Sequence, residues 1–356
     1  MAVPEGPLFY AHSDSCPPRP PALADSPALA DSDVLLPAHV RDLIAAGVAQ
    51  RDGDHRGRFA PSPTGPLHHG NLRTALLSWL VARLQRGEWL LRIDDLDQPR
   101  NRPGAEAAIL ADLDWLGLHW DGPVLRQSQR RGLYATVLSA LRRAGVLYPC
   151  RCSRRLLADV SAPHGGLSVY PGFCRQRPMA WGTGQGRLPS WRLALPAGAL
   201  HWQEAYGAPG RCDGRTTVGD IVVRRADGVV AYHLATAVDE LTLGIGTVVR
   251  GADLWASTAA QVAVMAALGQ APPRYGHVPL WRDGAGLRLS KREGAQGLEG
   301  DRAAGRDAAT VVGRLAASLG LVPPGSRLSA EELRAHLDPQ RLDQALAKGA
   351  PQSAEA

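Results

Sequence analysis

Apolar and polar positions follow two different periods from residue 57 onward. Between residues 72 and 80, apolar side chains recur every three or four positions, which predicts a helix over residues 70–86 that ends at Gly87. Short apolar runs at 57–60 and 89–93 predict strands on either side of this helix. A strand, a helix and a second strand in this order indicate a βαβ unit with parallel strands.

Further helix and strand patterns follow along the chain. Helical spacing occurs at 105–116, 131–144, 257–268, 306–319 and 329–348, and strands are expected at 247–250 and in a hairpin that pairs 218–224 with 229–234. Ser329 and Glu332 have the spacing of a capping box, which marks the start of the last helix. Residues 145–215 are rich in glycine and proline, and we expect an irregular segment there.

Residues 1–56 differ from the rest of the chain. They are rich in proline and alanine, and the hexapeptide PALADS occurs twice in succession, at 21–26 and 27–32. No strand or helix pattern appears before residue 35, although residues 35–48 could form one short amphipathic helix. We therefore expect a disordered or weakly ordered extension.

Composition narrows the class of protein. Hydrophobic residues make up 45% of the 356 positions and charged residues 21%, which excludes a globally disordered chain. No run of about 20 apolar residues is present, so a membrane-spanning bundle is excluded, and the N-terminus lacks a basic secretory leader. We expect a cytoplasmic protein. The net charge of +6 is compatible with a polyanionic partner but specifies none.

Two segments carry candidate phosphate chemistry. A turn-rich loop over 61–71 leads into the predicted helix at 70–86, and a helix N-terminus is a ready anion site because its first N–H groups are unpaired. His68 and Asn71 would add donors there, although a solvated surface loop would have the same residues. Lys291, one of only two lysines, lies in the segment RLSKR and could stabilise charge on a transferring phosphoryl group, or belong to a solvated basic loop.

The two segments together resemble a known family. PSPTGPLHHGNLRTAL resembles the HIGH signature of class I aminoacyl-tRNA synthetases, and RLSKR resembles their KMSKS loop. LRIDDLD, YHLATAVDE at 232–240 and VVRGADL at 248–254 are similar to the glutamyl/glutaminyl branch, in family order over residues 57–292. The resemblance implies an α/β fold with a Rossmann-type catalytic domain that forms an aminoacyl-adenylate from ATP, with Mg²⁺ accompanying the ATP.

The resemblance also implies the site residues. His68 and Lys291 would be catalytic, and the ATP-binding set would be His68, Gly70, Asn71 and Lys291. The L-glutamate pocket would be formed by Arg58, Ala60, Ser62, Asp94, Tyr232 and Arg250. Arginine suits a dicarboxylic substrate, since its planar fork binds carboxylates through two parallel bonds. Taken singly, the same arginines could be surface salt-bridge partners, Tyr232 a half-buried strand residue and Asp94 a simple cap.

Two positions depart from the family pattern. Asp94 stands where the family usually has glutamate, so its side chain is one methylene shorter and its reach to the substrate ammonium is reduced. His69 replaces the apolar second residue of the HIGH signature, which we expect to be tolerated because His68 and Gly70 keep their places.

Three of the five cysteines lie close together in the sequence. Cys150, Cys152 and Cys174 suit one structural Zn²⁺, which takes four tetrahedral ligands, whereas an odd, low cysteine count argues against a disulfide framework. Chemistry alone nominates His164 as the fourth ligand. The resemblance nominates Tyr170, because a CxC…YxxxC pattern looks like the zinc site of the glutamyl-queuosine tRNA(Asp) synthetases. The alternative is three buried free cysteines.

These features predict four regions along the chain. They are the extension at 1–56, a catalytic domain at 57–118 and 216–300, an insertion that resembles an acceptor domain and carries the zinc site at 119–215, and a short helical tail at 301–356. Only 65 residues follow Lys291, fewer than the roughly 100 that a separate anticodon-binding domain would need.

The resemblance implies a specific activity. A monomer of this family would activate glutamate without tRNA and transfer it to queuosine in the anticodon loop of tRNA(Asp). Arginines of the insertion, namely Arg151, Arg154, Arg155, Arg175 and Arg177, could contact tRNA phosphates or form a solvated surface. The alternatives are a truncated synthetase that charges a tRNA 3′ end, a non-catalytic tRNA-binding paralogue, and an adenylyltransferase of the same superfold acting on a small carboxylic acid.

Overall fold

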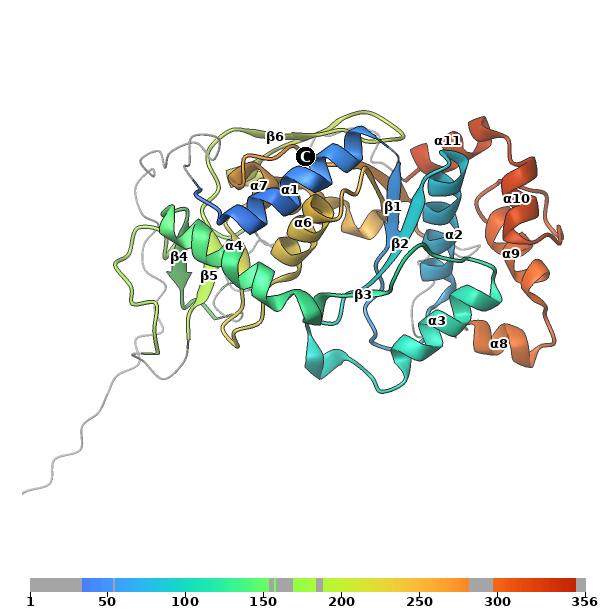
Figure 1. Ribbon diagram of the computed structural model, residues 1–356, viewed down its shortest axis with the longest axis horizontal. Coiled ribbons are helices and arrows are strands. Elements are labelled where there is room, and N and C mark those ends of the chain that lie inside the picture. Colours follow the sequence, from blue (N-terminus) through green and yellow to red (C-terminus); the bar gives the residue numbers. More distant parts are fainter. Residues whose placement is uncertain are drawn as a thin grey trace, which may run out of the picture.

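The computed structural model describes residues 34–53, 55–153, 157, 169–183, 188–281 and 297–349. Its elements form a parallel sheet with flanking helices, an antiparallel module at one end and a group of C-terminal helices at the other (Figure 1). Within the described residues, no helix has the length and apolar character needed to cross a bilayer.

Parallel strands form the centre of the molecule. Strands β1 (Arg56–Phe59), β2 (Glu88–Ile93) and β3 (Leu125–Arg126) lie in the order β1-β2-β3, and β9 (Thr247–Gly251) pairs with β10 (Arg274–Val278). The Gly246 N–H donates to Arg56 O at 2.9 Å and so joins the start of β9 to β1. Helix α2 (His69–Leu84) connects β1 to β2, which confirms the predicted βαβ unit and the Rossmann-type catalytic fold.

Helix α2 is buried on nearly all sides. Leu72, Leu76 and Leu80 are fully buried, as are Leu77 and Ala82 on other faces. The sheet covers one face, and the C-terminal helices α8 (Leu298–Ala303), α9 (Ala308–Ala317), α10 (Ala330–His336) and α11 (Pro339–Ala347) gather beside it (Figure 1). A helix that is apolar all round needs such cover, so the C-terminal tail completes the core around the candidate ATP-binding helix.

Three further helices of the catalytic region match the predicted spacing, namely α3 (Ala105–Trp115), α4 (Arg131–Arg143) and α7 (Trp255–Ala267). Helix α6 (Tyr232–Thr242) was not predicted, and short helical turns lie at Gln98–Arg100, Gln127–Arg130, Gly214–Val218 and Ala252–Leu254. The capping box of Ser329 with Glu332 is confirmed at the start of α10. The single helix predicted over 329–348 is wrong, because Pro339 cannot continue a helix and instead begins α11.

The strand expected at 229–234 is also wrong. The second strand of the hairpin, at 229–234, is only a bridge between Arg224 and Val230, and α6 begins at Tyr232. Leu234, Val238 and Leu241 are buried at helical spacing, and this burial decides the conformation.

The segment expected to be irregular contains short strands. In residues 145–215 these are β4 (Leu147–Cys150), β5 (Ser190–Leu193), β6 (Ala199–Trp202) and β7 (Gly210–Asp213). Each strand has four residues, and β4 pairs with β5 some 40 residues later in the sequence. The local sequence pattern therefore does not predict them. Strand β8 (Ile221–Arg224) pairs with β5, so the sheet of the insertion continues past the expected boundary at 215/216.

The expectation of disorder over residues 1–56 is wrong for its C-terminal part. Helix α1 (Ala38–Asp52) forms where one short helix was considered possible, and Val40 and Ile44 bury their side chains in the core that also contains α6. A Cβ at Gly47 would lie 1.9 Å from Leu241 O, so glycine allows α1 to approach α6 closely. Residues 1–33, which include the tandem hexapeptide, lie outside the described residues.

Candidate active site

His68 caps the N-terminus of α2. The Asn71 N–H donates to His68 Nδ1 at 3.2 Å, and the His68 N–H donates to Asn71 Oδ1 at 3.4 Å. Because Nδ1 accepts, the ring proton of the neutral imidazole is on Nε2, which makes Nε2 a donor. A Cβ at Gly70 would lie 2.9 Å from His68 Cε1, so only glycine fits beside the capping ring. The arrangement offers donors to an anion at the positive end of α2.

His69 has a structural partner that sequence reasoning missed. Its Nε2 lies 2.7 Å from Asp301 Oδ2 of α8, and Asp301 is fully buried. Arg306 and Arg314 donate to the other oxygen of Asp301 at 2.7 and 2.5 Å. The departure from the family signature at this position therefore joins α2 to the C-terminal helices.

Lys291 and the RLSKR segment lie outside the described residues. The chain is described again from Gly297, which forms a backbone bridge with His68. Gly297 follows Lys291 by six positions in the sequence.

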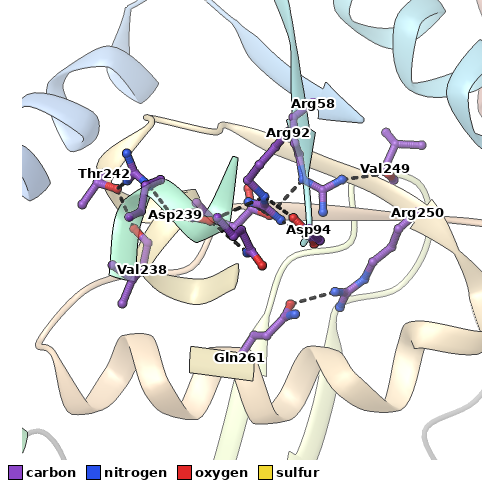
Figure 2. Close-up of polar contacts among 12 residues, drawn as sticks. Arg58, Arg92, Asp94, Val238, Asp239, Thr242, Val249, Arg250 and Gln261 are labelled. Carbon is purple, nitrogen blue, oxygen red and sulfur yellow. Dashed lines mark hydrogen bonds and ion pairs between the residues drawn. The ribbon is translucent and has the colours of Figure 1, made fainter. Parts of the chain in front are cut away.

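Arg58 and Asp94 meet in a buried charge network (Figure 2). Arg58 on β1 donates from Nε to Glu240 Oε1 at 2.9 Å and from Nη1 to Val249 O at 3.1 Å. Arg92 on β2 donates to both oxygens of Asp94, at 2.7 and 3.2 Å, and to Glu240 Oε1 at 3.4 Å. The Asp94 N–H donates to Pro61 O, so the loop that carries Ala60 and Ser62 lies beside Asp94.

Three members of this network were not predicted as site residues, namely Arg92, Asp239 and Glu240. Asp239 accepts from Gln127 at 3.0 Å, Arg130 at 2.7 Å and Tyr134 at 2.8 Å, and it is fully buried. Buried charges must be paired and hydrogen-bonded, and this set meets that requirement with residues from β2, α4 and α6. The available signal was the run of acids in VDE and the arginine of LRIDD.

The environment shifts the pKa values of two carboxyl groups in opposite directions. Burial raises the pKa of Asp94 to about 6, although the charge of Arg92 opposes the shift. Burial also tends to raise the pKa of Glu240, but the charges of Arg58 and Arg92 outweigh burial and lower it. Glu240 is therefore a permanent anion of the core, and Asp94 is an acid that titrates near neutrality.

Arg250 lies close to this network, and its charge contributes to the lowered pKa of Glu240. Arg250 at the end of β9 donates to Gln261 Oε1 at 2.7 Å and to Thr258 Oγ1 at 2.6 Å, and both partners lie on α7. Its Nε is buried and has no partner among the residues that the structure describes, and the same holds for Glu240 Oε2. Tyr232 is the first residue of α6 and is 37% exposed, so it is no strand residue. Buried polar atoms without partners are typical of a ligand site.

The cysteine cluster forms a separate candidate metal centre. The sulfurs of Cys150, Cys152 and Cys174 lie within 4.8 Å of one another, and Cys152 Sγ is 3.6 Å from Cys174 Sγ. The Tyr170 hydroxyl lies 3.4 Å from Cys150 Sγ and 3.5 Å from Cys152 Sγ. Thiolates bound at about 2.3 Å to one tetrahedral ion lie about 3.8 Å apart, so the cluster could hold a metal ion. His164 lies outside the described residues.

Arg192 lies against this cluster. Its Nε donates to Cys150 Sγ at 3.3 Å, and its guanidinium lies 3.7 Å from the Tyr170 ring centre. Hydrogen bonds from Cys152 and Cys174, together with the charge of Arg192, lower the pKa of Cys150. A thiolate is the form that binds metal, so the surroundings favour the liganding state.

The three described arginines of the insertion differ in their surroundings. Arg175 is buried and donates to Asp220 Oδ1 at 2.9 Å, so it is a structural residue. Arg151 donates to Gly182 O, whereas Arg177 is exposed. Arg154 and Arg155 lie outside the described residues.

Comparison with known proteins identifies the family. Residues 55–312 match the family model described as tRNA synthetases class I (E and Q), catalytic domain. A Glutamyl-Q tRNA(Asp) synthetase of Prochlorococcus marinus (strain MIT 9313) is 55% identical over 302 residues, which is 85% of this chain and 94% of that protein. A Glutamyl-Q tRNA(Asp) synthetase of Synechococcus sp. (strain CC9605) is 55% identical over 309 residues, which is 86% of this chain and 98% of that protein.

A solved structure shares the fold. The glutamate tRNA ligase of Elizabethkingia meningosepticum, crystallised in complex with its amino acid, is 26% identical with a TM-score of 0.66, covering 85% of this chain and 68% of that one. The family model covers the strands and helices that hold Arg58, His68, Asp94 and Arg250. The chain therefore belongs to the class I aminoacyl-tRNA synthetases, in the branch that acts on glutamate and glutamine (E and Q).

Proposed function

We propose that this chain activates L-glutamate with ATP in the absence of tRNA and transfers the glutamyl group to queuosine in the anticodon loop of tRNA(Asp). The observation that carries the proposal is the identity of 55% to Glutamyl-Q tRNA(Asp) synthetases over 94% and 98% of their lengths. The buried arginines and the capped helix N-terminus supply the chemistry that this reaction needs.

Glutamate would bind between the charged residues of β1, β2 and β9. Arg58 and Arg250 face the two carboxylates, Asp94 faces the ammonium, and Tyr232, Ala60 and Ser62 complete the pocket. The buried Nε of Arg250 is a donor that a substrate carboxylate would satisfy. The pocket thus matches a substrate with two negative groups and one positive group.

ATP would bind at the N-terminus of α2. A substrate carboxylate oxygen attacks the α-phosphorus, a P–O bond forms, and the bond to the pyrophosphate oxygen breaks. His68 Nε2–H donates to a phosphate oxygen, Gly70 and Asn71 keep the cap in shape, and Lys291 neutralises the developing charge. Mg²⁺ that accompanies ATP would neutralise the leaving pyrophosphate. In the second step a queuosine hydroxyl attacks the glutamyl carbonyl and AMP leaves.

The cysteine cluster would hold one structural Zn²⁺. Three thiolates and the Tyr170 oxygen supply four ligands for a closed tetrahedral site. The ion would fix β4 and the Tyr170 segment of the insertion, which would meet the tRNA. We expect the protein to act as a cytoplasmic monomer.

The test is glutamate-dependent ATP–pyrophosphate exchange without tRNA, with aspartate and glutamine as control substrates. We expect exchange with glutamate only. Exchange that requires tRNA would indicate an enzyme that charges a tRNA 3′ end, and a product lost after periodate oxidation of the terminal ribose would support that alternative. No exchange in either case, from folded metal-loaded protein, would indicate a non-catalytic tRNA-binding paralogue.

Asp94 predicts a pH dependence of glutamate binding. Its pKa of about 6 means that the carboxylate becomes protonated below pH 6 and can no longer pair with the substrate ammonium. We therefore expect the KM for glutamate to rise about tenfold between pH 7 and pH 5, with most of the rise below pH 6. The KM for glutamate is the informative quantity, because Asp94 is proposed to pair with the substrate ammonium and not to act on ATP. A KM that stays flat from pH 5 to 7 would contradict this assignment.

The raised pKa of Asp94 has the opposite consequence for folding, because it stabilises the folded protein at low pH. The folded state holds its proton at Asp94 up to about pH 6, whereas the unfolded carboxyl loses it near 3.8, so the unfolded state binds fewer protons between these values. This group therefore favours folding at low pH, and its contribution is lost as the pH rises through that interval. Asp94→Asn removes both titrations and is the matched control.

A further inference from the structure

A chain of buried hydrogen bonds leads from Arg250 away from the substrate pocket. Arg250 Nη2 donates to Thr258 Oγ1 at 2.6 Å, and Thr258 Oγ1 lies 3.2 Å from His277 Nε2 on β10. His277 Nδ1 lies 3.0 Å from Glu204 Oε2, and Trp202 Nε1 donates to Glu204 Oε1 at 2.8 Å. Thr258, His277 and Glu204 expose 0%, 1% and 8% of their surface, so water does not compete for these bonds.

The chemistry of these groups determines which atom donates and which accepts in each of these hydrogen bonds. Glu204 as a carboxylate can only accept, so His277 carries its proton on Nδ1 and accepts on Nε2. Thr258 must then donate its hydroxyl proton to His277, which leaves its lone pairs for Arg250. All four links run from the guanidinium or the indole toward one carboxylate, and none can be reversed without leaving a buried donor or acceptor unsatisfied.

We propose that Thr258, His277 and Glu204 are positioning residues that hold the Arg250 guanidinium in the orientation that receives the substrate carboxylate. The inference rests on the proposed glutamate activation. Gln261 binds Nη1, and the hydrogen-bonded series of Thr258, His277 and Glu204, here called the relay, binds Nη2. The Tyr275 ring lies 4.9 Å from the guanidinium carbon. Nε is the buried donor that lacks a partner among the described residues. Two nitrogens and one face of Arg250 are thus fixed before substrate arrives, which lowers the entropy lost on binding.

The relay also links distant parts of the chain. Glu204 follows β6 in the insertion, whereas His277 lies on β10 of the central sheet. The Glu204 segment is held there by the backbone as well, because the Ala205 N–H donates to Tyr275 O at 2.6 Å. The insertion therefore contributes to glutamate recognition through Arg250.

Thr258→Val is the first test, with Thr247→Val as its control. Both substitutions replace a buried threonine hydroxyl by a methyl group, but Thr247 Oγ1 has no hydrogen-bond partner among the described residues. In the tRNA-independent exchange assay, we expect Thr258→Val to raise the KM for glutamate about 10- to 100-fold, because one hydrogen bond to a charged group is lost. We expect kcat and the KM for ATP to change by less than about twofold, since the lost interaction with glutamate is equally strong in the ground state and the transition state. Thr258→Ser keeps the hydroxyl and should restore the wild-type KM.

Glu204→Gln tests the far end of the relay. The amide can accept from His277 or from Trp202 but not from both, so one donor loses its partner or the relay reverses. We expect a rise in the KM for glutamate in the same direction as for Thr258→Val. Equal KM values for Thr258→Val and Thr247→Val, or a parallel loss of kcat and of ATP binding, would overturn the inference while leaving the proposed function standing. A wild-type protein without glutamate-dependent exchange would instead refute the proposed function.

Discussion

Replacing His68 by alanine is expected to reduce the rate of glutamate-dependent ATP–pyrophosphate exchange by two to three orders of magnitude. The reason is that His68 Nε2–H is a preorganised donor at the start of α2, and one such donor to a developing anion is worth about 100- to 1,000-fold in kcat. The loss should appear in kcat rather than in the KM for glutamate, because the ring acts on the phosphate and not on the amino acid pocket.

The matched variant is His68→Asn. Asparagine is among the best N-cap residues, so its amide oxygen can accept from the Asn71 N–H as His68 Nδ1 does. We expect His68→Asn to retain the thermal stability of the wild type but to lose activity as His68→Ala does. The alanine variant should additionally lose about 1 kcal/mol of stability with the cap. If His68→Asn were fully active, the imidazole would be only a helix cap.

The parts of the site that sequence predicted are those that adjacent residues specify. His68, Gly70 and Asn71 form one cap within four positions, and the predicted loop and helix suffice to place them. Cys150 and Cys152 are likewise near neighbours, and the spacing to Cys174 follows a pattern typical of metal sites. Contiguous motifs can be interpreted because backbone geometry alone brings their side chains together.

The parts that sequence did not predict are assembled from distant segments. Arg92, Asp239 and Gln127 meet from β2, α6 and the turn before α4, and the relay joins Glu204, Thr258 and His277. The acids of VDE and the arginine of LRIDD were visible in the sequence, but only tertiary packing buries these residues and makes their pairing obligatory. The same holds for strands β4, β5 and β8, which have four residues each and pair with strands far along the chain.

The charge network also bears on the shorter side chain at position 94. Arg92 holds both oxygens of Asp94, so the carboxylate has a fixed orientation instead of the freedom of a longer glutamate. Glu240 lies in the same network and keeps one oxygen without a partner among the described residues. In the proposed binding mode, the field of Glu240 would add to that of Asp94 at the substrate ammonium and so offset part of the lost methylene.

The largest effect on stability is expected from loss of the cysteine cluster. Cys150→Ser should reduce the zinc content of the purified protein from about one ion per chain to near zero, since the oxygen is a poor substitute for a buried thiolate ligand. Cys212→Ser is the control, because Cys212 is a free cysteine of β7 outside the cluster. Metal analysis and thermal unfolding measure both variants. Zinc binding that survived in Cys150→Ser would contradict the site.

Tyr170→Phe decides the fourth ligand. The phenylalanine ring keeps the contact with the Arg192 guanidinium but removes the oxygen that lies 3.4 Å from Cys150 Sγ. We expect zinc affinity, measured by competition with a chelator, to fall at least about tenfold, because even partners that only orient a ligand contribute 10- to 100-fold. An unchanged zinc affinity would exclude Tyr170 as the fourth ligand and indicate His164 instead. His164→Ala, measured in parallel, should leave zinc affinity unchanged if Tyr170 completes the site, because a closed tetrahedral centre has no fifth position to fill.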